Sequence, residues 1–281
     1  MNSYRSLWEK LLLFYDENEA KAIIRTVLEV RYGMTLTDVL CDKVSELSTH
    51  ERHALQKIID RLTHGEPVQY VLGKTCFAGR TFHVGPGVLI PRPETEGLCQ
   101  WIISSSEDHP AHPAILDIGT GSGCIAITLA LGIPQARVSA WDISDRALEI
   151  AKDNASALKA QVYFEQQDIL SAPKDAMRWD TIVSNPPYIC PSEATDMERH
   201  VLEHEPDSAL FTPEGRPLFF YQAIAEYALH ALKPKGSLYL EINPRYAESL
   251  HKMLTAYGLT TIETRKDQFG KKRMMKAVRP F

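Results

Sequence analysis

The stretch AILDIGTGSGC, residues 114–124, decides the class of fold. It begins as an apolar, β-forming run, passes through glycines at positions 119, 121 and 123, and continues into a helical pattern. Glycines at this spacing permit a tight turn and let the backbone approach a ligand, while the start of the next helix offers unpaired N–H groups. A strand, glycine turn and helix in this order are typical of a nucleotide-binding loop, although a purely structural turn also uses glycines.

Downstream of this unit, extended and helical runs alternate. The extended runs are AILDIG, RVSAWDI, VYFEQQD, DTIVSN and SLYLEI, and the helical runs cover residues 122–131, 144–158, 217–232 and 245–257. Such alternation predicts a mostly parallel, doubly wound α/β sheet. The last two runs, TTIETR and RMMKAV, have no room for a helix between them, so we expect an antiparallel pair at one end of a seven-stranded sheet.

Upstream, the pattern is helical. Ser48 with Glu51 three residues later predicts a capped amphipathic helix, and Asp16 and Gly33 bracket another. Between about residues 68 and 91 we expect short extended pieces, VQYVLG, TFHVG and GVLIPRP, that form a hairpin between two domains. The predicted organisation is a helical bundle at 1–75, a β-hairpin connector at 76–91 and the α/β domain at 92–281.

Composition excludes several classes of protein. The chain has 281 residues, of which 44% are hydrophobic, and a formal net charge of −5. It contains no apolar run of about 18 residues, and the acidic residues Glu9, Asp16 and Glu17 near the start argue against a signal peptide. We therefore expect a cytoplasmic protein without a membrane segment. The five cysteines contain no C-x-x-C pair, which argues against both a disulfide framework and a thiolate zinc site.

One histidine pair needs separate attention. HVLEH, residues 200–204, has the H-x-x-E-H spacing of inverted zinc peptidases. Pro206 ends any helix there, however, and nothing downstream marks a third ligand. We expect no metal site.

Acidic residues end the next two extended runs. In an open α/β sheet, ligands bind beyond the carboxyl ends of the strands, near the point where strand order reverses. Asp142 lies 23 residues after Gly119, a spacing that suits a carboxylate on the two ribose hydroxyls, and Asp168 ends the third run. A dinucleotide fingerprint would need a glycine where Cys124 stands, so NAD is disfavoured. The pattern resembles that of class I S-adenosylmethionine-dependent methyltransferases.

The fourth run ends in Asn185-Pro186-Pro187-Tyr188. In such a sheet this run lies beside the first. A planar NH₂ group is a poor nucleophile, so methyl transfer to it requires the nitrogen to be held in line with its electron density available. The side-chain oxygen of Asn185 and the carbonyl of Pro186 provide two acceptors for the two N–H bonds. With the prolines fixing that carbonyl and Tyr188 packing on the flat group, we interpret the loop as a rigid clamp.

Three motifs together resemble the HemK/PrmC family of protein-(glutamine-N5) methyltransferases, which act on class I peptide chain release factors. They are LIPRPETE at 89–96, DIGTGSG at 117–123 and SNPPYI at 184–189. The resemblance extends over nearly the whole chain, with GEPVQYVLG at 65–73, Glu205-Pro206 and FGKKR at 269–273. N-P-P-Y is shared with adenine and cytosine amino-methyltransferases, but IPRPETE is not.

The resemblance implies the residues of the site. S-adenosyl-L-methionine would be bound by Asp117, Gly119, Thr120, Gly121, Ser122, Gly123, Asp142, Asp168, Ile169 and Asn185. The substrate glutamine would be held by Asn185, Pro186, Pro187 and Tyr188, of which Asn185, Pro186 and Tyr188 would be catalytic. Many members have an aromatic residue at the position of Ile169, which leaves the adenine contact there open. The roles of Arg92 and Glu94 in the connector also stay open.

The main alternative is an N6-adenine methyltransferase that uses the same clamp on a flipped base in DNA or RNA. Such an enzyme normally needs a basic surface, and a net charge of −5 argues against one. A non-catalytic binding module is disfavoured because the cofactor and clamp motifs are both intact. We expect release factors as partners, no direct contact with nucleic acid or membrane, and a monomer. The sequence does not indicate which release factors are substrates.

Overall fold

The computed structural model describes residues 3–105 and 110–281. The first two residues of the predicted bundle and residues 106–109 of the predicted α/β domain thus lie outside the described residues. The chain packs as two compact units. One consists of Met1–Lys74 and Glu198–His204, the other of Thr75–Met197 and Glu205–Phe281.

The first unit is helical, as its sequence predicts. The Asp16 carboxylate accepts the amides of Asn18 and Glu19 at the start of α2, and Gly33 ends that helix in the left-handed conformation. Ser48 and Glu51 form the predicted capping box on α4. The elements are α1 (Tyr4–Trp8), η1 (Glu9–Leu11), α2 (Glu17–Tyr32), α3 (Leu36–Leu40), η2 (Lys43–Glu46), α4 (Thr49–Leu62) and α5 (Val68–Leu72).

Helix α5 corrects the expectation of an extended piece at VQYVLG. Residues Val68–Leu72 form a helical turn that Gly73 ends with a φ of 71°. Val71 is buried in the core of the unit, and Val68 and Leu72 pack against the same core. The β preference of the two valines is therefore overridden by the packing that a helical turn provides.

A short segment from far along the sequence completes this unit. Helix α9 (Arg199–His204) groups with the bundle. The Arg199 guanidinium lies 5.1 Å from the centroid of the Phe14 ring, and the His200 and Tyr15 rings lie 5.9 Å apart. The sequence pattern did not predict this grouping, because nothing local marks residues 198–204 as part of a distant domain.

The second unit contains the predicted seven-stranded sheet, in the order β5-β4-β3-β6-β7-β9-β8. Strands β3 to β7 run parallel, and β9 is antiparallel to both β7 and β8, so the predicted antiparallel pair is confirmed. The order reverses between β3 and β6, the first and fourth strands of the predicted alternation. The strands are β3 (Ala114–Ile118), β4 (Arg137–Asp142), β5 (Val162–Gln166), β6 (Trp179–Ser184), β7 (Leu232–Glu241), β8 (Thr260–Lys266) and β9 (Lys272–Val278).

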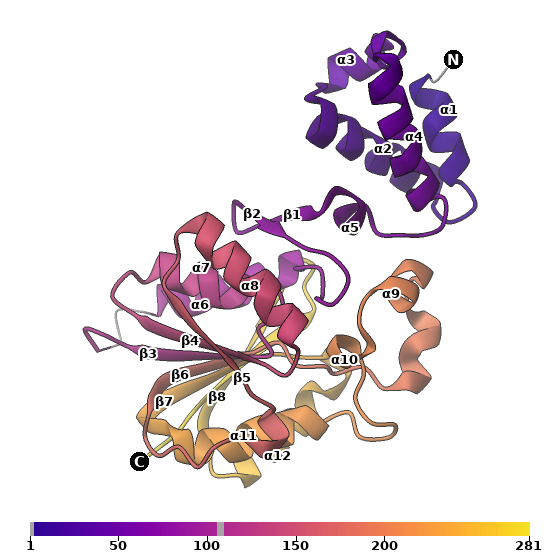
Figure 1. Cartoon of the computed structure of the whole chain (residues 1–281). Coiled ribbons are helices and arrows are strands. Elements are labelled where there is room, and N and C mark those ends of the chain that lie inside the picture. Colours follow the sequence, from indigo (N-terminus) through magenta and orange to yellow (C-terminus); the bar gives the residue numbers. More distant parts are fainter. Residues whose placement is uncertain (1–2, 106–109) are drawn as a thin grey trace. The chain divides into compact units, whose positions relative to one another are not determined.

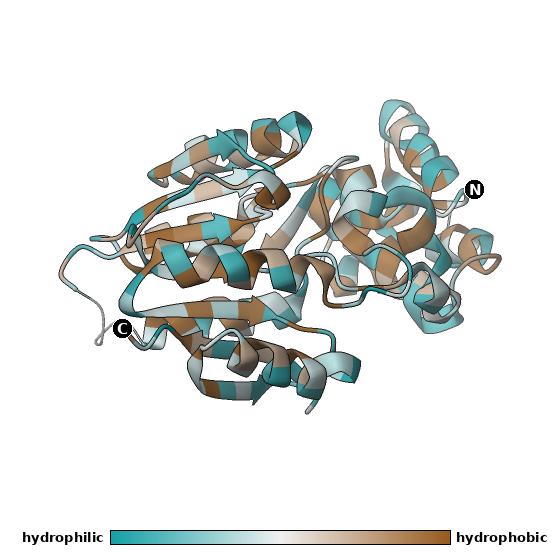
Figure 2. Cartoon of the chain, turned by 90° about the horizontal axis from the view of Figure 1, so that it is seen from below, coloured by the Kyte–Doolittle hydropathy of each residue, from teal (hydrophilic) through white to brown (hydrophobic). Residues whose placement is uncertain are grey.

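Helices cover both faces of this sheet. Figure 1 shows α6, α7 and α8 over one face and α11 and α12 over the other. Each face has its own buried apolar cluster, and the helices in Figure 2 are banded in brown and teal, as amphipathic helices are. The helices are α6 (Pro93–Ser104), α7 (Cys124–Gly132), α8 (Asp145–Leu158), α10 (Asp207–Leu210), α11 (Phe219–Ala231) and α12 (Ala247–Ala256), with 3₁₀ turns η4 (Ile169–Ser171), η5 (Pro191–Asp196) and η6 (Pro244–Tyr246).

The connector forms a hairpin of β1 (Lys74–Phe77) and β2 (Arg80–His83). The following piece, GVLIPRP, joins no strand, although Val88 and Ile90 are buried. The Ile90 amide instead donates to the Glu205 side chain at 3.0 Å. A carboxylate thus replaces a strand partner here.

Candidate active site

The strand tips meet where the sheet order reverses. Ile118, the last residue of β3, pairs with Trp141 of β4 on one side and with Ser184 of β6 on the other. Gly119 and Asn185 directly follow these paired positions. The glycine loop and the Asn-Pro-Pro-Tyr loop therefore leave the sheet side by side, as the sequence predicted.

The glycine loop has the backbone conformation that its sequence requires. Gly119, Gly121 and Gly123 have φ values of 74°, 54° and 80°, in the left-handed region that favours glycine. A Cβ atom on Gly123 would lie 2.9 Å from Ile127 Cδ1 and 3.1 Å from Ala151 Cβ, so close packing also requires glycine there. A Cβ on Gly119 or Gly121 would meet nothing within 4 Å. At these two glycines the backbone faces open space.

Asp142 is fixed at the edge of this open space. Its Oδ2 accepts the Gly121 amide at 2.8 Å, and its Oδ1 accepts the Ser144 amide at 2.9 Å. Burial raises the pKa of Asp142, and the amide hydrogen bonds act against that rise. Each carboxylate oxygen keeps a further lone pair that can accept a ligand hydroxyl.

Asp117 lies deeper than the loop. Its Oδ2 accepts the Thr120 hydroxyl at 2.7 Å and the Ala126 amide at 3.2 Å, and burial raises its pKa to about 7. Within the described residues, its Oδ1 has no hydrogen-bond partner. The Asp117 carboxylate thus holds the glycine loop through one oxygen, while its other oxygen is buried without a partner among the described residues.

A cavity of about 270 Å³ lies over these tips. It brings together part of the predicted site: Gly119, Gly121, Asp142, Asp168, Ile169, Pro186 and Pro187. The other predicted residues do not line it: Asp117, Thr120, Ser122, Gly123, Asn185 and Tyr188. Asp168 lines the cavity while its Oδ1 caps η4 through the Leu170 amide at 2.9 Å.

Two further walls of the cavity were not predicted. Gly87–Leu89 of the connector form one, and residues of α10 and α11, including Ser208 and Phe220, form another together with Phe211, which follows α10. These walls carry no local motif of ligand binding, so periodicity alone could not identify them.

Glu205 links two of the walls. Its side chain is fully buried, accepts the Ile90 amide, and forms an ion pair with Arg92. Arg92 belongs to the IPRPETE motif and Glu205 precedes the cavity residue Pro206. Arg92, whose role the sequence left open, thus forms an ion pair with Glu205.

The Asn-Pro-Pro-Tyr loop is held at both ends and free at its centre. Ser184 Oγ donates to the Ile118 carbonyl at 2.7 Å, and Tyr188 Oη donates to Glu241 Oε1 at 3.3 Å. In the part of the chain that the structure describes, neither the Asn185 side chain nor the Pro186 carbonyl forms a hydrogen bond within the protein. Both acceptors therefore remain available to a ligand.

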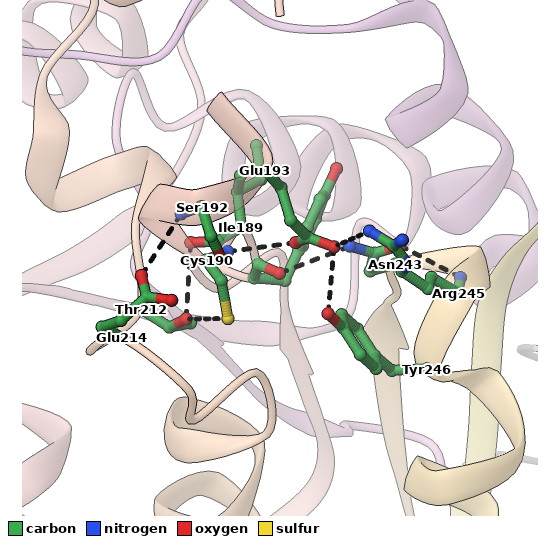
Figure 3. Close-up of polar contacts among 10 residues, drawn as sticks. Ile189, Cys190, Ser192, Glu193, Thr212, Glu214, Asn243, Arg245 and Tyr246 are labelled. Atoms are coloured by element: carbon green, nitrogen blue, oxygen red, sulfur yellow. Dashed lines mark hydrogen bonds and ion pairs between the residues drawn. The ribbon is translucent and has the colours of Figure 1, made fainter. Parts of the chain in front are cut away.

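The chain that follows the motif is tied down by Glu193. Its carboxylate accepts the Cys190 amide at 3.1 Å, the Arg245 guanidinium at 2.7 Å and the Tyr246 hydroxyl at 2.9 Å. Figure 3 shows the side chains of Arg245 and Tyr246, both from η6, meeting Glu193. Burial acts to raise the pKa of Glu193, but the hydrogen bonds outweigh it and lower the pKa.

Asn154 joins the glycine loop to the connector. This buried amide of α8 accepts the His83 amide at 2.6 Å and donates to the carbonyls of His83 and Ser122, each at 2.9 Å. The sequence marked Asn154 only as a helical residue. Its contacts make β2 a support for the loop.

Within residues 3–105 and 110–281, no three His, Cys, Asp or Glu side chains are grouped so that they could hold a metal ion. Among the same residues, no helix combines the length and the apolar composition needed to cross a bilayer.

Comparison with known proteins identifies the chain. The PrmC N-terminal domain family model matches residues 7–73, and the methyltransferase small domain model matches residues 100–219. A release factor glutamine methyltransferase of Bacteroides thetaiotaomicron is 44% identical over 266 residues, which cover 94% of this chain and 95% of the relative. That of Flavobacterium psychrophilum is 36% identical over 279 residues and 98% of both chains.

The chain belongs to the release factor glutamine methyltransferase family.

The predicted resemblance to the HemK/PrmC family is thereby confirmed. The crystal structure of a methyltransferase from Pyrococcus furiosus is also similar, with a TM-score of 0.52, 15% identity, and coverage of 83% of this chain and 100% of that one. This likeness supports the methyltransferase fold alone. Membership of the release factor glutamine methyltransferase family indicates a methyl-transfer enzyme that uses S-adenosyl-L-methionine.

Proposed function

We propose that this protein transfers the methyl group of S-adenosyl-L-methionine to the side-chain nitrogen, N5, of the glutamine in the Gly-Gly-Gln motif of class I peptide chain release factors. The observation that carries the proposal is a single cavity lined both by the glycine loop with Asp142 and by Pro186 and Pro187. Relatives that match nearly the whole chain are named release factor glutamine methyltransferases. The reaction is a group transfer, so the protein is a transferase.

The cavity residues fit this cofactor. When bound, S-adenosyl-L-methionine supplies an electrophilic methyl group on its sulfonium. The open backbone at Gly119 and Gly121 suits close approach of a ligand, and the Asp142 carboxylate has lone pairs for the ribose hydroxyls. Asp168 and Ile169 contribute to the same wall. Asp117 is fully buried and would act from beneath, by holding the loop through the Thr120 hydroxyl and the Ala126 amide.

The Asn-Pro-Pro-Tyr loop would hold the glutamine. Asn185 Oδ1 and the Pro186 carbonyl accept the two N–H bonds of the substrate amide, which fixes the nitrogen in line with the methyl group and raises its electron density. Neither acceptor has a competing partner in the described chain. No general base is required before attack, because the proton becomes acidic only as the nitrogen gains positive charge.

The helical unit would recognise the substrate protein. We assign it this role because it carries none of the cofactor or clamp motifs, yet it matches a domain model of its own. The net charge of −5 favours a protein substrate over a nucleic acid. We further propose that the enzyme acts as a monomer, without direct contact with nucleic acid, in the cytoplasm, where its proposed substrates act.

The test is methyl transfer from labelled cofactor to three substrates: an intact release factor, its Gly-Gly-Gln→Gly-Gly-Ala variant, and duplex DNA. We expect label on the first alone, and mass spectrometry should place it on the glutamine side chain. Equal labelling of the glutamine-less variant, or label at N6 of adenine, would refute the proposed function in favour of a different acceptor.

A further inference from the structure

A buried carboxylate beside the clamp has no role in the mechanism so far. Glu241 is the last residue of β7 and is 2% exposed. Strand β7 pairs with β6 so that Leu240 lies opposite Ser184. Glu241 and Asn185 are therefore the next residues along two neighbouring strands, and Glu241 lies directly beside the start of the Asn-Pro-Pro-Tyr loop.

Both oxygens of Glu241 accept hydrogen bonds from the family motifs. Oε1 accepts the Tyr188 hydroxyl at 3.3 Å, and Oε2 accepts the Thr95 hydroxyl at 2.6 Å. Thr95 belongs to IPRPETE and Tyr188 to the Asn-Pro-Pro-Tyr loop. One carboxylate thus bridges two motifs that are 93 positions apart in the sequence (188 − 95).

The surroundings of Glu241 act on the pKa of its carboxyl in opposite directions, and burial has the larger effect. Burial raises the pKa of Glu241, whereas the Thr95 hydrogen bond and the charge of Arg273 lower it. Arg273 is itself held by Asp267 at 3.4 Å. Burying a carboxylate costs free energy that an apolar side chain in the same strand would avoid. The two directed hydrogen bonds are what an apolar residue could not provide.

We propose that Glu241 is a positioning residue of the glutamine-binding site at the Asn-Pro-Pro-Tyr loop. Its carboxylate links the Tyr188 hydroxyl to the Thr95 hydroxyl and thereby sets where the phenol ring lies. This role rests on the proposed function, because it assumes that the Tyr188 ring packs on the substrate glutamine. Glu241 does not touch the reacting atoms. It acts through Tyr188, whose ring has no other side-chain hydrogen bond among those described.

The experiment is a mutant cycle on methyl transfer to an intact release factor, with cofactor affinity measured by calorimetry. Glu241→Leu and Tyr188→Phe should each lower kcat about tenfold, and the cofactor Kd should stay within about twofold of wild type. The double variant should lose no more than the larger single loss, because both changes remove the same hydrogen bond. Glu241→Gln keeps an oxygen for Tyr188 and should restore most of kcat.

Tyr221→Phe is the matched control. Tyr221 also donates a buried hydrogen bond to Glu241, at 3.0 Å, but to its backbone carbonyl and not to its carboxylate. Its loss should lower Tm and leave kcat unchanged. If Glu241→Leu does not fold, Thr95→Val with Tyr188→Phe forms the cycle, and the Thr95 effect should vanish in the Tyr188→Phe background.

The outcomes separate the two proposals. If the wild type is active and the losses in kcat of the two single variants multiply in the double variant, the role of Glu241 is overturned while the proposed function stands. A Tyr188→Phe variant with wild-type kcat would do the same. A wild type that places no label on the release factor would instead remove the proposed function, and the role of Glu241 with it.

Discussion

Asp142 illustrates how one side chain serves both the fold and the ligand. The carboxylate accepts the amides of Gly121 and Ser144, and so fixes the glycine loop against the start of α8. Asp142 also lines the cavity, and its oxygens have lone pairs left for hydroxyl donors. A ligand that donates to Asp142 therefore meets an acceptor that is already oriented, and the entropic cost of binding is reduced.

We predict that Asp142→Ala weakens binding of S-adenosyl-L-methionine by about 2–4 kcal/mol, because charge-assisted hydrogen bonds to the ribose are lost. Calorimetry on the folded variant measures this. Part of the loss will reflect the two amides left without an acceptor, so a 2′-deoxy analogue of the cofactor serves as control. If Asp142 holds the ribose, the analogue should bind more weakly than the cofactor to wild type but not to the variant.

Some residues of the site could be predicted from the sequence, and others could not. Gly119, Asp142 and Pro186 follow extended runs directly, so the rule for strand tips identified them. Glu241 and Asn154 were missed because their partners, Thr95 and His83, lie 146 and 71 residues away. A single polar residue at a strand end or in a helix has no periodicity that marks such a contact.

At the scale of elements, the segment after the clamp is held by side chains rather than by a strand. Residues Pro191–Asp196 form only a 3₁₀ turn, η5. Glu193 ties this turn to the loop between β7 and α12 through Arg245 and Tyr246, and its side chain is 13% exposed. The Ser192 amide adds one further bond, to Glu214 at 3.2 Å, so two carboxylates hold the segment that follows the clamp.

We predict that Glu193→Ala lowers the free energy of unfolding by about 1–3 kcal/mol, because it removes the acceptor of the amide of buried Cys190 and of two side-chain donors. The effect should depend on pH. Burial alone would raise the pKa of Glu193, but its hydrogen bonds lower it below the ordinary value of 4.5. Its contribution is thus fully present above pH 4.5 and is lost as pH falls through the lower, folded-state pKa.

Chemical denaturation at pH 7 and at lower pH measures the difference between wild type and Glu193→Ala, which should narrow as pH falls. The control is Glu149→Ala, which breaks an exposed ion pair with Arg146 in the same unit and should change stability little at either pH. Two variants with equal, small effects would contradict the anchoring role of Glu193.

The elements themselves followed from the sequence to different degrees. The seven-stranded sheet and the capped helices α2 and α4 were predicted, because hydrophobic periodicity and capping residues are local signals. Helix α5 was predicted as extended, since its two valines favour strands until the core of the bundle is known. The grouping of α9 with the bundle depends on contacts with Phe14 and Tyr15 that have no local signal at all.

For the molecule as a whole, the two units divide the proposed work. The cavity and the clamp lie entirely within the second unit. The first unit reaches back into the sequence of the second through Glu198–His204, which is followed directly by the buried Glu205. A substrate protein bound by the first unit would therefore be presented to the clamp at a raised effective concentration, without new contacts at the reacting atoms.

We predict that deleting residues 1–73 lowers kcat/KM for an intact release factor by about 100-fold or more, because the second binding surface is lost. Cofactor affinity, measured by calorimetry, should stay within about threefold, since all residues that line the cavity lie in the second unit, and it reports whether the remaining chain folds. A short peptide with the Gly-Gly-Gln motif is the matched substrate control. It is too small to reach a second surface, so the full-length and shortened enzymes should methylate it at the same low rate. Equal losses with peptide and protein would mean that the helical unit supports the clamp itself, and its assignment to substrate recognition would be wrong.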